Sequence, residues 1–87
     1  MRKVVFESTA LEHLAYWAKT DLKILKKIIE LSENAAKTPF EGIGKPEKLK
    51  GNFQGYYPRR ITQEHRIVYE VTDDDTISVI LCRHHHE

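Results

Sequence analysis

The sequence predicts an α+β fold in which two N-terminal helices pack on a curved, mainly antiparallel sheet. Three observations predict it: a short apolar run near the N-terminus, two stretches with apolar residues at helical spacing, and three extended segments in the second half. A chain of 87 residues can bury one modest core, so we expect a single domain over residues 1–87. Hydrophobic residues make up 40% and charged residues 31%, which is typical of a globular rather than a disordered chain.

The start of the chain predicts one strand followed by one helix. Val4-Val5-Phe6 is an apolar run suited to a first strand. Thr9 and Glu12 have the spacing of a capping box, which predicts that a helix begins there. The apolar face of this helix would consist of Leu11, Leu14, Ala15 and Ala18.

A second helix is predicted directly afterwards. Thr20 is expected to cap it, and Asp21 is suited to the positive end of the helix dipole. Pro39 predicts the end of the helix, because the residue before a proline is pushed out of the helical region. A broad apolar stripe for packing on a sheet contains Ile24, Leu25, Ile28, Ile29, Leu31 and Ala35.

The second half of the chain predicts a loop and three strands. Residues 40–55 contain all four glycines, as structured loops often do. The segment 56–62 has strand character, and Pro58 within it predicts an edge strand or a bulge. Asp73-Asp74-Asp75 predicts a hairpin turn between two strands with alternating apolar residues. These residues are Ile67, Tyr69 and Val71 before the turn and Ile77, Val79 and Leu81 after it.

The formal net charge of +1 hides an uneven distribution of charge. Between Lys45 and Arg66 six basic side chains face two acidic ones, whereas from Ile67 onward one basic side chain faces five acidic ones. A basic middle segment suggests a polyanionic partner, since phosphate contacts supply most non-specific affinity for nucleic acids. A solvated lysine-rich surface is the other interpretation. The small total charge predicts weak binding to free RNA.

The sequence also indicates the compartment. No apolar run is long enough to cross a bilayer, and Glu7 and Glu12 interrupt the segment in which a signal-peptide core would lie. The one cysteine, Cys82, cannot form an internal disulfide, which agrees with a reducing compartment. We therefore expect a cytoplasmic protein. Cys82 itself is expected to be a buried strand residue and not a nucleophile, because nothing around it would activate a thiolate.

Four phrases, in this order, resemble the Txe/YoeB family of toxins within the RelE superfamily of mRNA interferases. The phrases are Thr38-Pro39-Phe40-Glu41-Gly42, Gly44-Lys45-Pro46-Glu47, the run from Arg59-Arg60-Ile61-Thr62 into Glu64-His65-Arg66-Ile67-Val68-Tyr69, and Cys82-Arg83 followed by histidines. The likeness spans nearly the whole chain, and the combination of the phrases makes it specific.

This resemblance implies a microbial-RNase-like (RelE-type) fold and the toxin half of a type II toxin–antitoxin system. It implies an endoribonuclease that cuts mRNA in the ribosomal A site without a metal or other cofactor. The implied partners are a cognate, YefM-like antitoxin, the ribosome and its mRNA. It further implies operator DNA binding only through the antitoxin complex, possible homodimers, and no membrane association.

The resemblance also implies a catalytic set: Glu47, Arg66, His85 and, for the last place, His86. The family usually ends in a tyrosine at that last place, so the phenol is missing here. In this interpretation Glu47, kept ionised by the neighbouring Lys45 and Lys48, is the base. Arg66 stabilises the phosphorane. His85 is the acid, because a free histidine titrates near neutral pH.

Other interpretations of these residues remain open. Arg66 could instead form a surface salt bridge with Glu64 or Glu70. The three consecutive histidines could be an expression-tag remnant or a frayed tail. A metal site is disfavoured, because adjacent residues of a strand point to opposite faces and do not converge on one ion.

Contacts with RNA or the ribosome are expected from Lys45, Lys48, Lys50, Arg59, Arg60 and Arg83. Arg59 and Arg60 alternate along a strand, so at most one of them should point toward RNA. His65 is expected to pack or hydrogen-bond, and Tyr16 and Trp17 are expected to anchor core or dimer contacts. The alternative function is a catalytically weakened binding module that acts mainly in an antitoxin and repressor complex.

Overall fold

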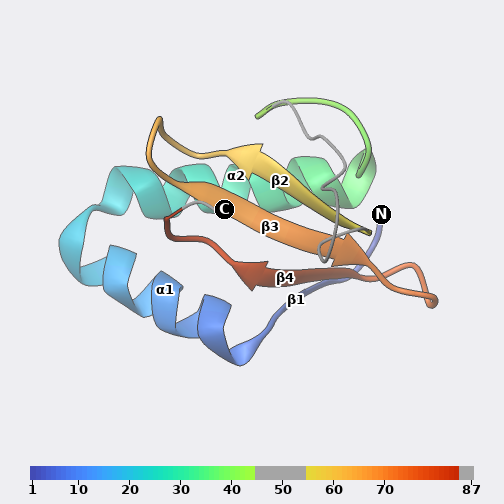
Figure 1. Ribbon diagram of the computed structural model, residues 1–87, viewed down its shortest axis with the longest axis horizontal. Helices are drawn as coiled ribbons and strands as arrows, with labels where there is room; N and C mark the ends of the chain where they lie inside the picture. The colour runs from blue at the N-terminus through green and yellow to red at the C-terminus, as the bar shows by residue number, and fades with distance from the viewer. Residues whose placement is uncertain (45–54, 85–87) are drawn as a thin grey trace.

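The computed structural model describes residues 1–44 and 55–84, and it confirms the predicted α+β architecture (Figure 1). Two consecutive helices follow the first strand, and three strands follow them. The elements are β1 (Val4–Phe6), α1 (Ser8–Thr20), α2 (Leu22–Lys37), β2 (Tyr56–Arg60), β3 (Arg66–Val71) and β4 (Ile77–Leu81).

The four strands form one mixed sheet in the order β1-β4-β3-β2. The β2–β3 and β3–β4 pairs are antiparallel, whereas β1 pairs in parallel with β4. Strand β2 lies at an edge, which confirms the position predicted from Pro58, since a proline cannot donate to a neighbouring strand. A register shift between Val68 and Tyr69 interrupts the β3–β4 pairing, and irregularities of this kind bend a strand.

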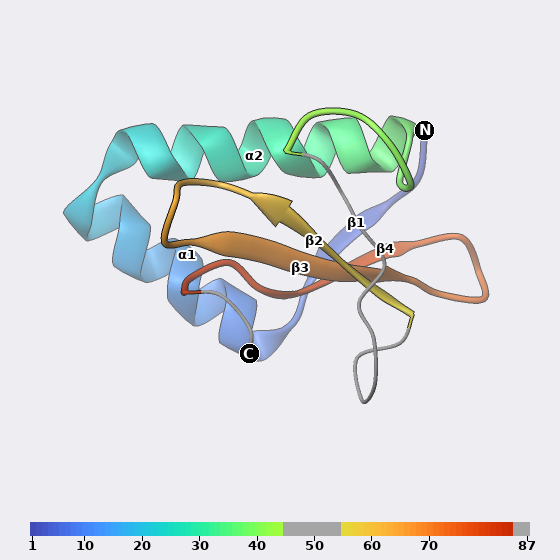
Figure 2. The ribbon, with the colours of Figure 1, turned by 45° about the horizontal axis from the view of Figure 1, so that its top comes forward.

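Both helices pack on one face of the sheet (Figure 2). Helix α1 contacts α2, β4 and β1, and α2 contacts α1 and β1. In Figure 1, α2 lies behind the sheet. We call the opposite face, which carries Arg60, Arg66, Glu70 and Ser78, the open face. The core between the helices and the sheet consists of Ala10, Trp17, Ile28, Leu31, Ala35, Ile61, Ile67, Tyr69, Ile77, Val79 and Cys82.

The starts of both helices differ from the predictions. Helix α1 begins at Ser8, after Glu7 in the N-cap position, so the capping box predicted at Thr9 is wrong. Glu7 is held by the sheet, because its backbone N–H donates to Val79 O at 2.9 Å, and the chain turns into the helix at that point. The predicted Thr20 cap is also wrong, since Thr20 is the last residue of α1.

Asp21 alone joins the two helices. Its Oδ1 accepts from the backbone N–H groups of Lys23 at 3.0 Å and Ile24 at 3.4 Å, which makes it the N-cap of α2. Its own N–H donates to Trp17 O at 2.8 Å and closes the last turn of α1. At its other end α2 stops at Lys37, two residues before Pro39, as predicted.

The remaining predictions concern the hairpin and the membrane. A turn at residues 72–76 joins β3 and β4, which confirms the hairpin predicted from the three aspartates. Asp75 adopts a left-handed backbone with φ 63°, a conformation that aspartate tolerates in turns. In the part of the chain that the structure describes, no helix has both the length and the apolar character needed to cross a membrane.

Candidate functional site

Four backbone segments lie side by side at one end of the sheet. The N–H of Arg60 donates to Gly44 O at 2.9 Å, Arg60 pairs with Arg66 across β2 and β3, and the N–H of Arg66 donates to His84 O at 2.8 Å. The resulting row is Gly44, Arg60, Arg66, His84. Gly44 and His84 are the last described residues before segments 45–54 and 85–87, so both segments begin next to this pair of arginines.

Most of the predicted site residues lie outside the described residues. These are Glu47, His85 and His86 of the catalytic set and Lys45, Lys48 and Lys50 of the binding set. The structure describes Arg66, Arg59, Arg60 and Arg83. It brings Arg60 and Arg66 together at the end of the sheet, whereas Arg59, next to Arg60 in β2, is buried.

Arg66 is half-buried, and its side chain is anchored through one nitrogen. Nη1 donates to three carbonyl oxygens of the turn between β2 and β3: Thr62 at 2.8 Å, His65 at 3.1 Å and Gln63 at 3.3 Å. Within residues 1–44 and 55–84 no hydrogen bond of Nε or Nη2 and no salt bridge to Glu64 or Glu70 is present. A guanidinium held at one nitrogen can present the others to a phosphate.

Arg60 shares the open face with Arg66. Residues directly opposite in an antiparallel pair project to the same side of the sheet, and Arg60 is exposed. Two guanidinium groups therefore stand on neighbouring strands of one surface. This arrangement confirms the predicted alternation, in which only one of Arg59 and Arg60 faces outward.

Arg59 faces the opposite way, and the expectation that it contacts RNA is corrected. Its side chain is fully buried between β2 and the end of α2. An arginine has five N–H donors, and Arg59 makes five hydrogen bonds. Nε donates to Tyr69 Oη (3.0 Å), Nη1 to Asn34 Oδ1 and Ile43 O (3.0 Å), and Nη2 to Thr38 O (2.7 Å) and Glu41 O (3.0 Å). No donor is left for a phosphate.

These bonds fix residues 38–44, the segment that leads to Glu47. Two glycines let the backbone come close to the guanidinium. A Cβ on Gly44 would lie 2.9 Å from Arg59 Cβ, and a Cβ on Gly42 would lie 2.3 Å from Asn34 Oδ1. Both glycines also have positive φ, which other residues rarely adopt.

Tyr69 on β3 supplies the remaining hydrogen-bond acceptor for Arg59. Its hydroxyl accepts from Arg59 Nε and donates to Pro39 O. Burial raises the pKa of Tyr69, with Arg59 acting in the opposite direction, so the phenol stays neutral and keeps its proton for this carbonyl. The sequence alone did not identify Tyr69 or Asn34 as partners of a buried charge. The sequence signal that could have found this site is Asn34, a polar residue three positions after the core residue Leu31 and therefore on the same face of α2.

The start of the C-terminal tail is held by α1. Trp17 Nε1 donates to Cys82 O at 2.9 Å, and the N–H of Cys82 donates to His13 Nδ1 at 3.0 Å. Burial raises the pKa of the Cys82 thiol to about 12, so it remains protonated, as expected for a structural cysteine. Trp17 is buried in the core, which confirms its predicted role as an anchor.

Arg83 lies over the ring of Tyr16, with its guanidinium carbon 3.5 Å from the ring centroid. Its Nε is buried and has no hydrogen-bond partner among the described residues. Such stacking on an aromatic face is a common arrangement for arginine. The contact of Arg83 with ribosomal RNA stays a prediction, and Tyr16 makes an intramolecular contact.

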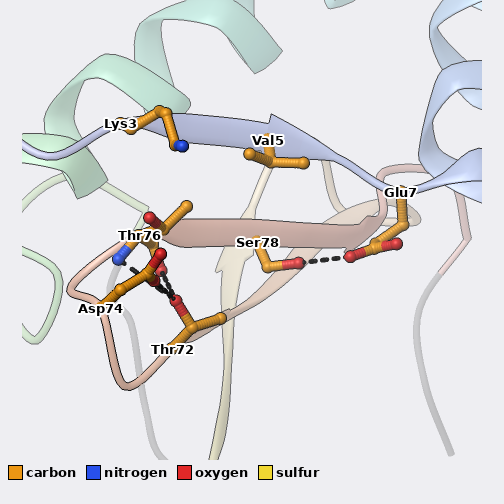
Figure 3. A pocket seen from close by; sticks show the side chains of 7 residues that line it. All are labelled: Lys3, Val5, Glu7, Thr72, Asp74, Thr76 and Ser78. Atoms are coloured by element: carbon orange, nitrogen blue, oxygen red, sulfur yellow. Dashed lines mark hydrogen bonds between the residues drawn. The ribbon is translucent and has the colours of Figure 1, made fainter.

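A shallow depression of about 340 Å³ lies elsewhere on the open face, along β1 and β4 (Figure 3). It is lined by Lys3, Val5, Glu7, Thr72, Asp74, Thr76 and Ser78. Its polar groups bond to one another, as in the 2.7 Å bond from Ser78 Oγ to Glu7 Oε1. None of the predicted site residues lines this depression, so the pair Arg60 and Arg66 is the better candidate for the functional site. Within residues 1–44 and 55–84 no group of three potential ligands could hold a metal ion.

Comparison with known proteins identifies close relatives. The protein-family model described as the YoeB-like toxin of bacterial type II toxin–antitoxin systems matches residues 6–86. Toxin YoeB from Escherichia coli (strain K12) is 48% identical over 84 residues, which cover 97% of this chain and 99% of that protein. The YoeB/ParE toxin from Agrobacterium tumefaciens is 45% identical with a TM-score of 0.92, covering 97% of this chain and 99% of that one.

Two further solved structures come from Staphylococcus aureus. The YoeB dimer is 44% identical and the YoeB–YefM complex 42% identical, each with a TM-score of 0.87. The dimer match covers 98% of both chains, and the match to the complex covers 99% of both. The toxin–antitoxin complex RelBE2 from Mycobacterium tuberculosis is 21% identical with a TM-score of 0.75, covering 97% of this chain and 98% of that one. This last likeness concerns the fold alone.

Replacing Arg59 by lysine is expected to lower the free energy of unfolding by about 3 kcal/mol or more. Lysine has fewer donors, and each buried polar group left unpaired costs about 1–3 kcal/mol. The matched control is Arg60→Lys on the same strand, which should change stability by about 0.5 kcal/mol or less because Arg60 is exposed. Urea denaturation measures both variants, and equal effects would contradict the assigned role of Arg59.

The half-buried His13, which accepts from the N–H of Cys82, makes part of the stability depend on pH. Burial, and then the charges of Arg83 and His84, lower the pKa of His13 below its ordinary value of 6.5, against an opposing effect of Glu12. The unfolded chain therefore takes up this proton at higher pH than the folded chain. The contribution is complete above about pH 6.5 and is lost as the pH falls from there toward the lowered native pKa.

The variant His13→Asn keeps a possible acceptor that does not titrate in this range. We expect its free energy of unfolding to fall less than that of the wild-type chain between pH 7.5 and pH 5. Urea denaturation at several pH values measures the difference, and parallel pH profiles for the two proteins would contradict it.

Proposed function

The chain belongs to the YoeB-like toxin family of bacterial type II toxin–antitoxin systems, and on this basis we propose that it is a ribosome-dependent, metal-independent mRNA endoribonuclease. The observation that supports the proposal most is the pair Arg60 and Arg66 on the open face. The chain leaves for Glu47 on one side of this pair and for His85 on the other.

In the proposed reaction the RNA supplies its own nucleophile, the 2′-hydroxyl next to the scissile phosphate. Glu47 takes the proton of this hydroxyl as the 2′-oxygen forms a bond to phosphorus. The bond from phosphorus to the 5′-oxygen breaks, and His85 donates a proton to that oxygen. The products are a 2′,3′-cyclic phosphate and a free 5′-hydroxyl, so no metal ion or redox step is needed.

Arg66 stabilises the negative charge that develops on the phosphorane. Electrostatic stabilisation by preorganised groups is usually the largest single contribution to catalysis. The bonds from Arg66 Nη1 to three carbonyl oxygens preorganise the guanidinium before RNA arrives. Arg60, one strand away, contacts a neighbouring phosphate. His86 occupies the place of the usual tyrosine and supports the phosphate in its stead.

The remaining proposals concern partners. The similar Staphylococcus aureus proteins form a YoeB–YefM complex and a YoeB dimer. By likeness we propose a cognate YefM-like antitoxin for this chain, operator binding only through that complex, and a homodimer. Lys45, Lys48, Lys50 and Arg83 contact ribosomal RNA. Residues 1–87 act as one domain in the cytoplasm.

A catalytically weakened binding module is the alternative function. The observation that favours it is the sequence His86-Glu87 at the end of the chain, where the family usually has a tyrosine. Such a module would assemble the antitoxin and repressor complex without cutting RNA. Expression in growing bacteria separates the two functions, because only the nuclease should arrest growth in a way that the antitoxin relieves.

Cleavage of an mRNA on programmed ribosomes tests the proposal directly. We expect Arg66→Ala to lower the single-turnover rate by about 10²–10³-fold, the loss typical for one preorganised charge-stabilising donor. The exposed residue Lys26 on α2 offers a control, since Lys26→Ala should cut at the wild-type rate. A chelator selective for transition metals should leave the rate unchanged. Undiminished cutting by a chain carrying Glu47→Ala, Arg66→Ala and His85→Ala together would exclude the mechanism.

A further inference from the structure

Residues 82–84 are held through their backbone at both ends. The N–H and C=O of Cys82 bond to His13 and Trp17 of α1. The N–H of His84 donates to His65 Nδ1 at 2.8 Å, and its C=O accepts from the N–H of Arg66, also at 2.8 Å. The two bonds to His84 come from the consecutive residues His65 and Arg66, which together hold it.

His84 needs such support because its backbone is left-handed, with φ 62°. A residue other than glycine is strained in this region and persists there where its surroundings hold it. The bonds at its N–H and C=O supply that hold. They hold the backbone of His84 beside Arg66.

The imidazole of His65 is itself fixed from several sides. Its ring lies edge-on to Trp17, with ring centroids 4.7 Å apart, and 5.5 Å from the ring of His84. Its backbone is part of the turn between β2 and β3, where its N–H donates to Thr62 Oγ1 at 3.1 Å and its C=O accepts from the N–H of Ile61 at 2.9 Å. These contacts hold the ring so that Nδ1 accepts from the His84 amide.

His65 and Arg66 project to opposite sides of the sheet, as neighbours in an extended chain do. The ring of His65 faces Trp17 on the helix side, and the guanidinium of Arg66 stands on the open face beside Arg60. The same dipeptide thus carries the phosphate-facing arginine and holds the tail. Any shift of the tail relative to Arg66 requires one of the two bonds to break.

We propose that His65 is a positioning residue, which holds His84, the residue before His85, in register with Arg66 through a neutral Nδ1 acceptor. The inference rests on the proposed nuclease function, since it assigns the tail a part in the reaction. It names a chemical requirement: an acceptor at the position of Nδ1. A protonated or truncated side chain lacks this acceptor.

The test compares His65→Ala with His65→Asn, whose Oδ1 can replace Nδ1 as acceptor. We expect His65→Ala to lower kcat on programmed ribosomes by about 10–100-fold with little change in KM, because displacement of a reacting group by about 1 Å costs a loss of this order. His65→Asn should recover most of the rate. The stability control is Ser32→Ala in α2, which removes a buried bond to Ile28 O far from the tail and should keep the wild-type kcat.

A second measurement does not depend on activity. Hydrogen exchange of the His84 amide, followed by NMR, should be fast in His65→Ala and slow in both the wild-type chain and His65→Asn. A wild-type kcat and slow exchange in folded His65→Ala would overturn the inference, as would an asparagine variant that behaves like the alanine variant. If the wild-type chain does not cut mRNA, the nuclease proposal fails on its own, and exchange alone decides whether His65 holds the tail.

Discussion

The end of the sheet at which Gly44, Arg60, Arg66 and His84 lie side by side depends on a buried guanidinium. Arg59 carries a positive charge into the interior, and its five hydrogen bonds go to neutral oxygen atoms. An unpaired buried charge costs several kcal/mol, so the surrounding chain must converge on it. The contributors come from α2 (Asn34), from β3 (Tyr69) and from three carbonyl groups of residues 38–43. These bonds hold the backbone of residues 38–43, which has no regular secondary structure, in one conformation.

This constraint links the fold to the proposed chemistry. Because Arg59 points inward, Arg60 must point outward, and its partner across the sheet, Arg66, shares the same open face. Residues 38–44 end at Gly44, which is bonded to Arg60, and the C-terminal tail begins at His84, which is bonded to Arg66. In the proposed reaction the two arginines bind the phosphate, and the proposed base and acid follow Gly44 and His84 in the sequence. The helices take no part in this surface and stabilise it from behind.

The sequence predicted the elements well because their signals are local: apolar spacing, Pro39, Pro58 and the three aspartates of the hairpin. Both predicted caps were wrong, because distant or neighbouring contacts decide the helix start, such as the bond from Glu7 to Val79. The alternation of Arg59 and Arg60 was predictable, but which of them is buried was not. That choice depends on Asn34 and Tyr69, far away in the sequence. The roles of Glu47, His85 and His86 remain proposals from family likeness.

The most direct measurement is a crystal structure of the chain with a bound nucleoside 2′,3′-cyclic phosphate, the product end expected of the reaction. The account predicts phosphate oxygen atoms at hydrogen-bond distance, about 2.7–3.2 Å, from the Arg66 guanidinium on the open face, with Arg59 still buried. A phosphate bound elsewhere, for instance at Arg83 beside Tyr16, with Arg66 making no contact, would contradict it.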